Sequence, residues 1–182
     1  LPICESVDFV VETAQGNIRL FGYMEPLFGD ENQIIEWRFA KYKDRYRIRP
    51  WLYYLIQLAT KENALPPRII AKDKDLTLKT IEKSTALEKL KMYVEAYLQS
   101  QQQIQLIPTE NIAKFIEKDE SAVNFDNVLT NIESLAKDDS YGYRKADPYW
   151  ARVLGQTEQF KSKDGLLRLV KQTTSWFGEM LS

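Results

Sequence analysis

The sequence of 182 residues contains no histidine and only one cysteine, Cys4. Without histidine it has no Ser-His or Cys-His pair for nucleophilic catalysis, and without a cluster of cysteines and histidines it has no zinc site of the usual kind. A single cysteine cannot form a disulfide within the chain. The sequence also lacks a G-x-x-x-x-G-K-[S/T] loop for a nucleotide and any apolar run near the roughly 18 residues of a membrane span. We therefore expect no cofactor, no membrane anchor and a chain compatible with the cytoplasm.

Size and charge narrow the possibilities further. The net charge of −1 indicates no particular partner, whereas 182 residues suffice for a substantial core. Because the first residue is Leu1 rather than methionine, we expect a domain of a longer protein. We predict one domain over residues 1–182, with a sheet and a first helix in residues 1–83 and mostly helices in residues 84–182.

A hairpin is predicted around the polar turn at residues 29–32, which separates two strand-like runs. If the residues that flank this turn face each other, antiparallel register places Glu25 opposite Glu36. Arg38 then lies two residues along the same face, because strand side chains alternate. The register predicts a patch that holds two carboxylates and one cation.

A second turn, at residues 14–17, predicts a meander of three antiparallel strands. With Gly16 and Asn17 at the centre of this turn, Asp8 would lie opposite Glu25 and add a third acid; a slip of one residue would move it to the other face.

The other face of the third strand carries Ile35, Trp37 and Phe39. We expect these three side chains to pack inward against helices, and we prefer this role in the core to a role in base stacking. The strand would then have an apolar side toward the core and a charged side.

Helical periodicity begins at Arg49 and continues to Glu62, with Pro50 in the first turn, where its missing N–H costs nothing. Residues 68–71 and 76–81 read as strands on either side of a charged turn at 72–75, so we expect a second hairpin. Its tip is either ordinary surface or a wedge between nucleic-acid strands. Further helices are predicted over residues 85–98, 109–116, 125–136, 147–154 and 166–180.

The segment of residues 38–49 concentrates positive charge, with six basic residues against one acidic residue. Basic side chains interleaved with aromatic ones can neutralise phosphates and stack bases. From composition alone, a solvated loop or a surface that faces a protein partner is the simpler interpretation.

Two short stretches, GYME at residues 22–25 and IEWR at residues 35–38, resemble the paired strands of PD-(D/E)XK nucleases of the RecB-like form. Those strands carry G-x-x-D and D-x-K, and a Q-x-x-x-Y motif follows on the next helix, where this chain has residues 49–53. The sequence departs from the pattern at its chemical positions. Glu25 and Glu36 stand at the aspartates, Arg38 stands at the lysine and Arg49 at the glutamine, while Tyr53 is kept.

A nearer resemblance is to the C-terminal domain family of RecC, the gamma subunits of bacterial exodeoxyribonuclease V. In that family a degenerate form of the hairpin leads into a basic segment and a helix with a Trp-Leu-x-x-Leu-like run, here Trp51 to Leu55. The later Asp147-Pro148-Tyr149 also resembles a family feature. The resemblance extends from about Asp8 to the end of the chain.

This resemblance implies an α/β, PD-(D/E)XK nuclease-like fold, in which an antiparallel-rich sheet is flanked by helices and the C-terminal half is helical. It implies a role in a helicase-nuclease complex for double-strand-break repair and recombination, with RecB-like and RecD-like subunits and double- and single-stranded DNA as partners. Because nucleic acid meets this scaffold on the side of the basic segment, we predict DNA contacts there. The predicted DNA-binding residues are Arg38, Lys41, Tyr42, Lys43, Arg45, Arg47 and Arg49.

The departures argue against catalysis. Metal-assisted hydrolysis is the catalytic chemistry that the composition leaves open, and such a site uses acids to hold a divalent metal. Arg38 cannot act as a base, because a guanidinium keeps its proton, but it can form a forked pair with a carboxylate. We expect a structural ion pair and no metal. The alternatives are an active nuclease that binds Mg²⁺ and a protein scaffold that never touches DNA.

Overall fold

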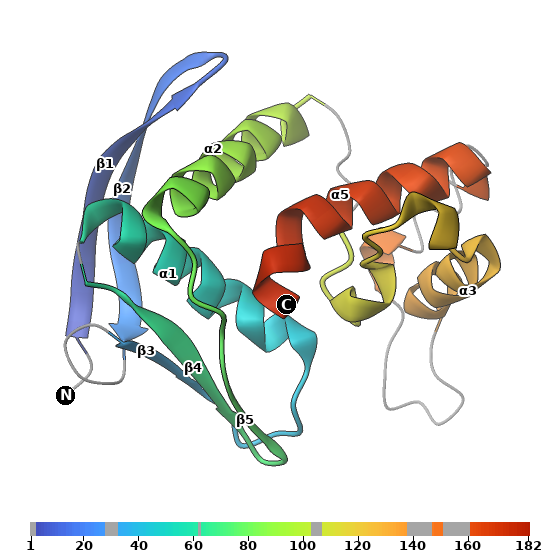
Figure 1. Cartoon of the computed structure of the whole chain (residues 1–182), viewed down its shortest axis with the longest axis horizontal. Coiled ribbons are helices and arrows are strands. Elements are labelled where there is room, and N and C mark those ends of the chain that lie inside the picture. The colour runs from blue at the N-terminus through green and yellow to red at the C-terminus, as the bar shows by residue number, and fades with distance from the viewer. Residues whose placement is uncertain (1–2, 28–32, 62, 103–106, 138–146, 151–160) are drawn as a thin grey trace. The chain divides into compact units, whose positions relative to one another are not determined.

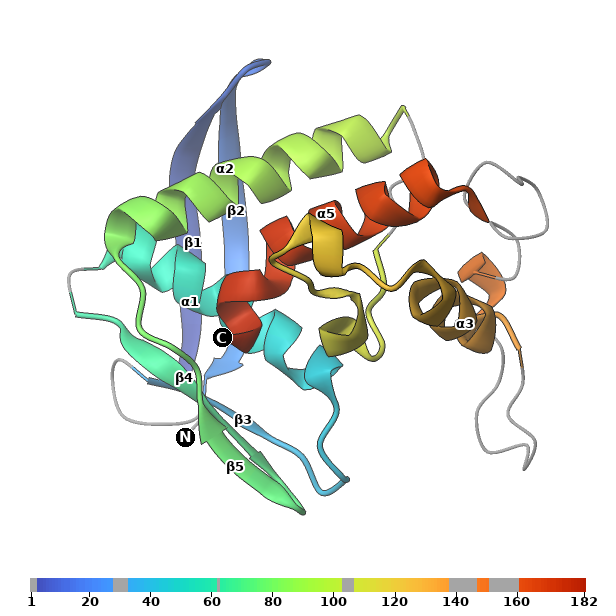
Figure 2. The same cartoon turned by 45° about the vertical axis from the view of Figure 1, so that its right-hand side comes forward.

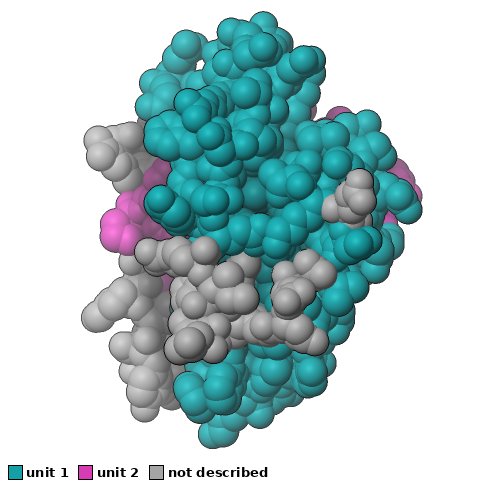
Figure 3. Space-filling model, turned by 90° about the vertical axis from the view of Figure 1, so that its left-hand side faces the viewer, with its two compact units in different colours: residues 1–105, 179–182 teal, residues 106–178 magenta. Residues whose placement is uncertain are grey.

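The computed structural model describes residues 3–27, 33–61, 63–102, 107–137, 147–150 and 161–182. The chain divides into two units, Leu1–Gln105 with Glu179–Ser182, and Leu106–Gly178 (Figure 3). The fold is mixed α/β with mostly antiparallel strand pairs, as the sequence predicts. The first unit therefore includes the helix over Lys83–Ser100 together with the sheets, whereas the predicted division between residues 83 and 84 assigned this helix to the second part. The single domain stays a prediction.

The first unit begins with a long hairpin of β1 (Ile3–Thr13) and β2 (Gly16–Leu27). Its ladder closes with Thr13 opposite Gly16, whose φ of +114° lies in the region that favours glycine. Asp8 therefore faces Phe21. The prediction that Asp8 faces Glu25 is wrong, because the turn closes about two residues earlier in the chain than Gly16 and Asn17.

A second sheet contains β3 (Gln33–Trp37), β4 (Leu65–Ala71) and β5 (Lys74–Thr77) in that order. β3 and β4 are parallel, and β4 and β5 form the expected antiparallel hairpin (Figure 1). A short 3-10 turn, η1 (Asp44–Arg47), and helix α1 (Ile48–Thr60) connect β3 to β4. Parallel strands require such a crossover.

The predicted pairing of β2 with β3 is wrong: within the described residues β2 pairs with β1, and β3 pairs with β4. The predicted turn at residues 29–32 lies outside the described residues. We attribute the parallel pairing to helix α1, which contacts both β3 and β4, on which Ile34 and Ile69 are buried. When β3 and β4 are paired, one helix can cover both strands. A hairpin of β2 and β3 would not bring β4 under the same helix.

Helix α2 (Lys83–Ser100) packs against α1 and β1 and completes the first unit (Figure 2). Three of its buried residues, Ala86, Leu90 and Val94, recur about one turn apart and form one stripe, and Ala96 is also buried. None of the described helices is long and apolar enough to cross a membrane.

The second unit contains 3-10 turns η2 (Ile112–Phe115) and η3 (Glu120–Ala122), helix α3 (Phe125–Leu135) and most of α5 (Lys163–Leu181). The helix expected over 109–116 is only the turn η2, which follows Asn111 in a left-handed conformation. Of the helix expected over 147–154, residues 148–150 are helical, Asp147 directly precedes them, and residues 151–154 lie outside the described residues. The core consists of Phe115, Val128, Ile132, Leu135, Trp150, Leu166, Leu169 and Val170.

Candidate functional site

Glu36 is a buried carboxylate on β3, an edge strand of the second sheet. It is only 3% exposed, and its neighbour on β4 is Ile69, which is fully buried. In β3, Ile34 and Glu36 are the buried residues and alternate with more exposed ones. Since one face of a strand takes every second residue, Glu36 shares the inner face with Ile34. A charge in this position requires close partners of opposite sign.

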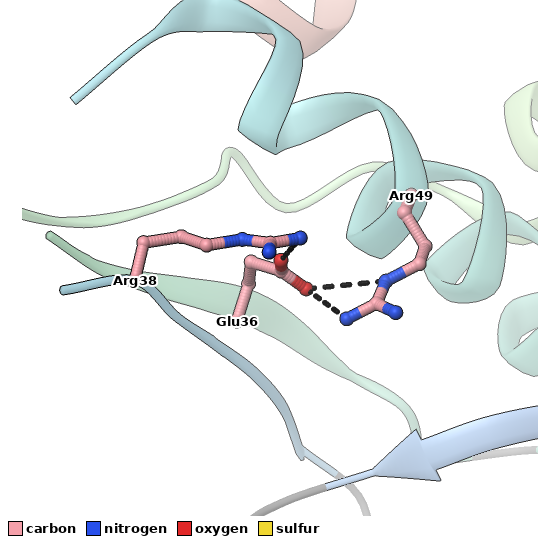
Figure 4. A network of polar contacts seen from close by, with 3 residues as sticks. All are labelled: Glu36, Arg38 and Arg49. Atoms are coloured by element: carbon pink, nitrogen blue, oxygen red, sulfur yellow. Dashed lines mark hydrogen bonds and ion pairs between the residues drawn. The ribbon is translucent and has the colours of Figure 1, made fainter. Parts of the chain in front are cut away.

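Two arginines supply that opposite charge (Figure 4). Arg38 directs a guanidinium nitrogen to Oε1 of Glu36 at 2.5 Å. Arg49, in the first turn of α1, donates to Oε2 through Nη2 at 2.6 Å and through Nε at 3.2 Å. Each carboxylate oxygen is therefore held by a different guanidinium. The three side chains together carry one net positive charge.

This donor set does not fit a divalent metal. Magnesium and calcium bind through several oxygen ligands, whereas both oxygens of Glu36 are already occupied by cations. Among the described residues no group of three or more acidic, cysteine or histidine side chains could hold a metal ion. The side chain of Glu25 lies outside the described part of the structure. A guanidinium also cannot remove a proton from water.

The predicted patch that joined Glu25, Glu36 and Arg38 is therefore only partly formed. Arg38 lies on Glu36, but the predicted Glu25–Glu36 register is wrong, because β2 and β3 belong to different sheets in the part of the chain that the structure describes. Arg49 completes the site from the helix, one turn before the half-buried Tyr53. The sequence position of Arg49 in the nuclease-like motif is the signal that marks it.

Trp37 and Phe39 lie on the outside of the sheet. Their exposed fractions are 62% and 88%, and their rings are 4.9 Å apart. The prediction that they belong to the core is wrong, since Ile34 and Glu36 occupy the inner face that was assigned to them. The face of β3 that is buried is therefore opposite to the predicted one. Glu36 can lie on the inner face because Arg49 of α1 and Arg38 after β3 neutralise its charge there.

Part of the basic segment holds the segment itself in place. Arg47 donates through Nε to the hydroxyl of Tyr42 and through Nη1 to the carbonyl of Met180 at 2.9 Å. Burial raises the pKa of the Tyr42 hydroxyl, so that group stays protonated at neutral pH. Arg38 and Arg45 lie over the ring of Tyr46, at 5.2 and 5.8 Å from its centre. These contacts fix the aromatic residues and give four of the predicted DNA-binding residues a structural role.

Lys41 and Lys43 differ from these arginines. Both are exposed, and neither forms an ion pair with any residue that the structure describes. Their ammonium groups are therefore the members of the predicted set best placed to meet an anion in solution.

Sequence reasoning missed two further lysines beside this segment. The amide of Lys72 donates to the carbonyl of Ala40 at 3.0 Å, and the amide of Tyr42 donates to Asp73 at 2.6 Å. These bonds place the tip of the β4–β5 hairpin next to the basic segment, with Lys74 over the ring of Tyr42 at 4.4 Å. The charged turn at 72–75 can be recognised in the sequence. That it lies beside the basic segment follows only from the parallel pairing of β3 with β4.

Comparisons with known proteins identify the family of the chain. The model of the RecC C-terminal domain family matches residues 4–120, which is well over half of the chain. The chain is also similar to the RecBCD enzyme subunit RecC of Haemophilus influenzae, with 52% identity over 178 residues. That alignment covers 95% of this chain and 15% of the relative, so the chain spans only a small part of the relative's length. The matched residues include both sheets, the ion-paired glutamate and the basic segment, and the chain belongs to the RecC C-terminal domain family.

Proposed function

We propose that this chain is a non-catalytic domain of a RecC-type subunit, which contacts DNA and supports partner subunits within a RecBCD-type helicase-nuclease. The observation that carries the proposal is the Glu36 site. At the position that resembles a nuclease metal ligand, both carboxylate oxygens are held by Arg38 and Arg49. This arrangement supplies fixed positive charge where the nuclease pattern has a metal ion.

The partners follow from the family. A relative with 52% identity bears the name RecBCD enzyme subunit RecC, so RecB-like and RecD-like subunits are the proposed protein partners. Double-strand-break repair and recombination in the cytoplasm are the proposed setting, with single- and double-stranded DNA as the nucleic-acid partners. Because this chain corresponds to a small part of such a subunit, the proposal concerns one domain of a larger assembly.

The DNA contact is proposed for the surface formed by Lys41, Lys43, Lys72 and Lys74, which we call the lysine surface. The backbone bonds between Lys72 and Ala40 and between Tyr42 and Asp73 bring its two segments together. A cluster of ammonium groups on one surface neutralises phosphates and releases their counterions, without reading the base sequence. We therefore expect weak DNA binding that is independent of sequence and strongly dependent on salt.

The salt dependence gives a quantitative test. Each phosphate contact with duplex DNA contributes about 0.9 to the slope of log affinity against log salt concentration. The double variant Lys41→Ala with Lys43→Ala should therefore reduce that slope by about 1.8 by the same accounting. The measurement is a fluorescence-anisotropy titration of labelled duplex at several salt concentrations.

Lys83→Ala with Lys91→Ala is the matched control, because both lysines are exposed, belong to α2 and change the net charge equally. This control should leave the slope unchanged. Equal effects of the two double variants would mean that only overall charge matters and that the lysine surface is not the DNA site. An unchanged slope together with lost association of a RecB-like or RecD-like subunit would favour the scaffold without DNA contact.

A further inference from the structure

Trp37 and Phe39 form an aromatic pair that is open to solvent. Their rings are 4.9 Å apart and inclined by 36°, and the side chains are 62% and 88% exposed. The other tryptophans, Trp51, Trp150 and Trp176, are buried. Contiguous exposed apolar surface is a common feature of binding sites, and aromatic side chains are enriched in them.

The surroundings of this pair are cationic. Phe39 is followed two residues later by Lys41, and the bond from Lys72 to Ala40 places a second chain segment with an exposed lysine beside it. The nearby acids are engaged, since Asp73 accepts the amide of Tyr42 and Asp75 forms an ion pair with Arg68 at 2.6 Å. A ligand with a flat apolar face and negative charge next to it is complementary to this arrangement.

Two kinds of macromolecule bind exposed aromatic side chains. The cores of protein interfaces are enriched in aromatic residues but depleted of lysine. Proteins that hold single-stranded nucleic acid instead combine aromatic rings, on which bases stack, with a cationic track for the phosphates. The lysines beside Trp37 and Phe39 favour the second kind. A duplex is a poor ligand for the pair, because the faces of its bases are already stacked on one another.

We propose that Trp37 and Phe39 form a stacking site for unpaired bases of single-stranded DNA, while Lys41, Lys43 and Lys72 contact the adjoining phosphates. This inference rests on the proposed contact of the domain with DNA. It assigns the binding of single-stranded DNA to the surface around Trp37 and Phe39. The site lies on the outer face of the second sheet, whereas the Glu36 ion pair lies on the inner face.

The test compares an oligo(dT) strand with a blunt duplex of equal length, using the 182-residue chain. Stacking on an aromatic side chain contributes about 1–3 kcal/mol per base, which corresponds to roughly 5- to 150-fold in affinity, so Trp37→Ala and Phe39→Ala should each weaken binding of oligo(dT) by a factor in that range. Duplex affinity should be unchanged, and Trp37→Phe should retain most of the single-strand affinity. Because Trp37 is the exposed tryptophan among the four, oligo(dT) should also quench the long-wavelength part of the tryptophan emission.

Phe21→Ala is the control, since Phe21 is 78% exposed on β2 and belongs to the other sheet. Circular dichroism of each variant verifies that the fold is kept. Binding of DNA without quenching and without any effect of Trp37→Ala or Phe39→Ala would overturn the stacking site and leave the DNA contact in place. Failure of the wild type to bind either form of DNA would overturn the proposed function as well. Loss of a RecB-like or RecD-like partner in Trp37→Ala, with DNA affinity unchanged, would assign the pair to a protein interface.

Discussion

Trp51→Ala is expected to lower the free energy of unfolding by about 3–5 kcal/mol, the usual cost of truncating a large aromatic side chain in a core. Trp51 has no exposed surface, and its indole nitrogen donates to the hydroxyl of Tyr93 at 3.1 Å. Its ring also lies 6.4 Å from that of Tyr54. The substitution therefore removes apolar contacts and leaves the hydroxyl of the half-buried Tyr93 without this donor.

Urea unfolding followed by circular dichroism measures this effect. Tyr97→Ala serves as the control, because Tyr97 is 66% exposed on α2 and its truncation should change stability by no more than about 0.5 kcal/mol. If Trp51→Ala leaves the chain unfolded, the milder Trp51→Phe should still show a lower urea midpoint than the wild type. Equal midpoints for Trp51→Ala and Tyr97→Ala would contradict the packing of α1 described above.

The double variant Arg38→Met with Arg49→Met is expected to cost about 3–5 kcal/mol, because it leaves the carboxylate of Glu36 buried without a cation. Methionine keeps most of the hydrocarbon stem of arginine, so the carboxylate stays covered while both guanidinium groups are lost. Thermal unfolding at neutral pH gives the change in stability.

Adding Glu36→Leu to this pair should restore most of the lost stability, since replacing a complete buried ion pair by apolar residues of similar volume is often neutral. The triple variant thus separates a requirement for charge balance from a requirement for these particular side chains. A triple variant as unstable as the double variant would contradict the assignment of the two arginines as charge partners of Glu36.

Local patterns in the sequence predict much of the fold. Helix α1, with Pro50 in its first turn, and the β4–β5 hairpin around a charged turn both follow from residues close together in the chain. The pairing of distant strands does not. The polar turn at 29–32 favours a hairpin between β2 and β3, whereas β3 pairs with β4 across α1. Which strands pair beneath a helix depends on the total apolar area that the pairing buries. A short stretch of sequence does not predict that area.

The candidate site shows the same division. The motif positions single out Glu36, Arg38 and Arg49 as one group, and the structure joins these three side chains through ion pairs. The direction in which β3 faces could not be predicted, because an alternating pattern with both charged and aromatic residues permits either face to be buried. Burial of Glu36 sends Trp37 and Phe39 outward, which is why an expected part of the core lies on the surface.

The most direct test of the account is a single incubation that reports both binding and cleavage. A labelled duplex with a single-stranded tail is mixed with the chain at low salt in the presence of Mg²⁺ or Mn²⁺, and native and denaturing gels are run in parallel. The account predicts retarded DNA that remains intact, because both oxygens of Glu36 are held by guanidinium groups, which cannot accept a proton from water. Arg38→Lys should not produce cleavage. Metal-dependent cleavage by the wild type that disappears in Glu36→Ala would contradict the account and identify an active nuclease.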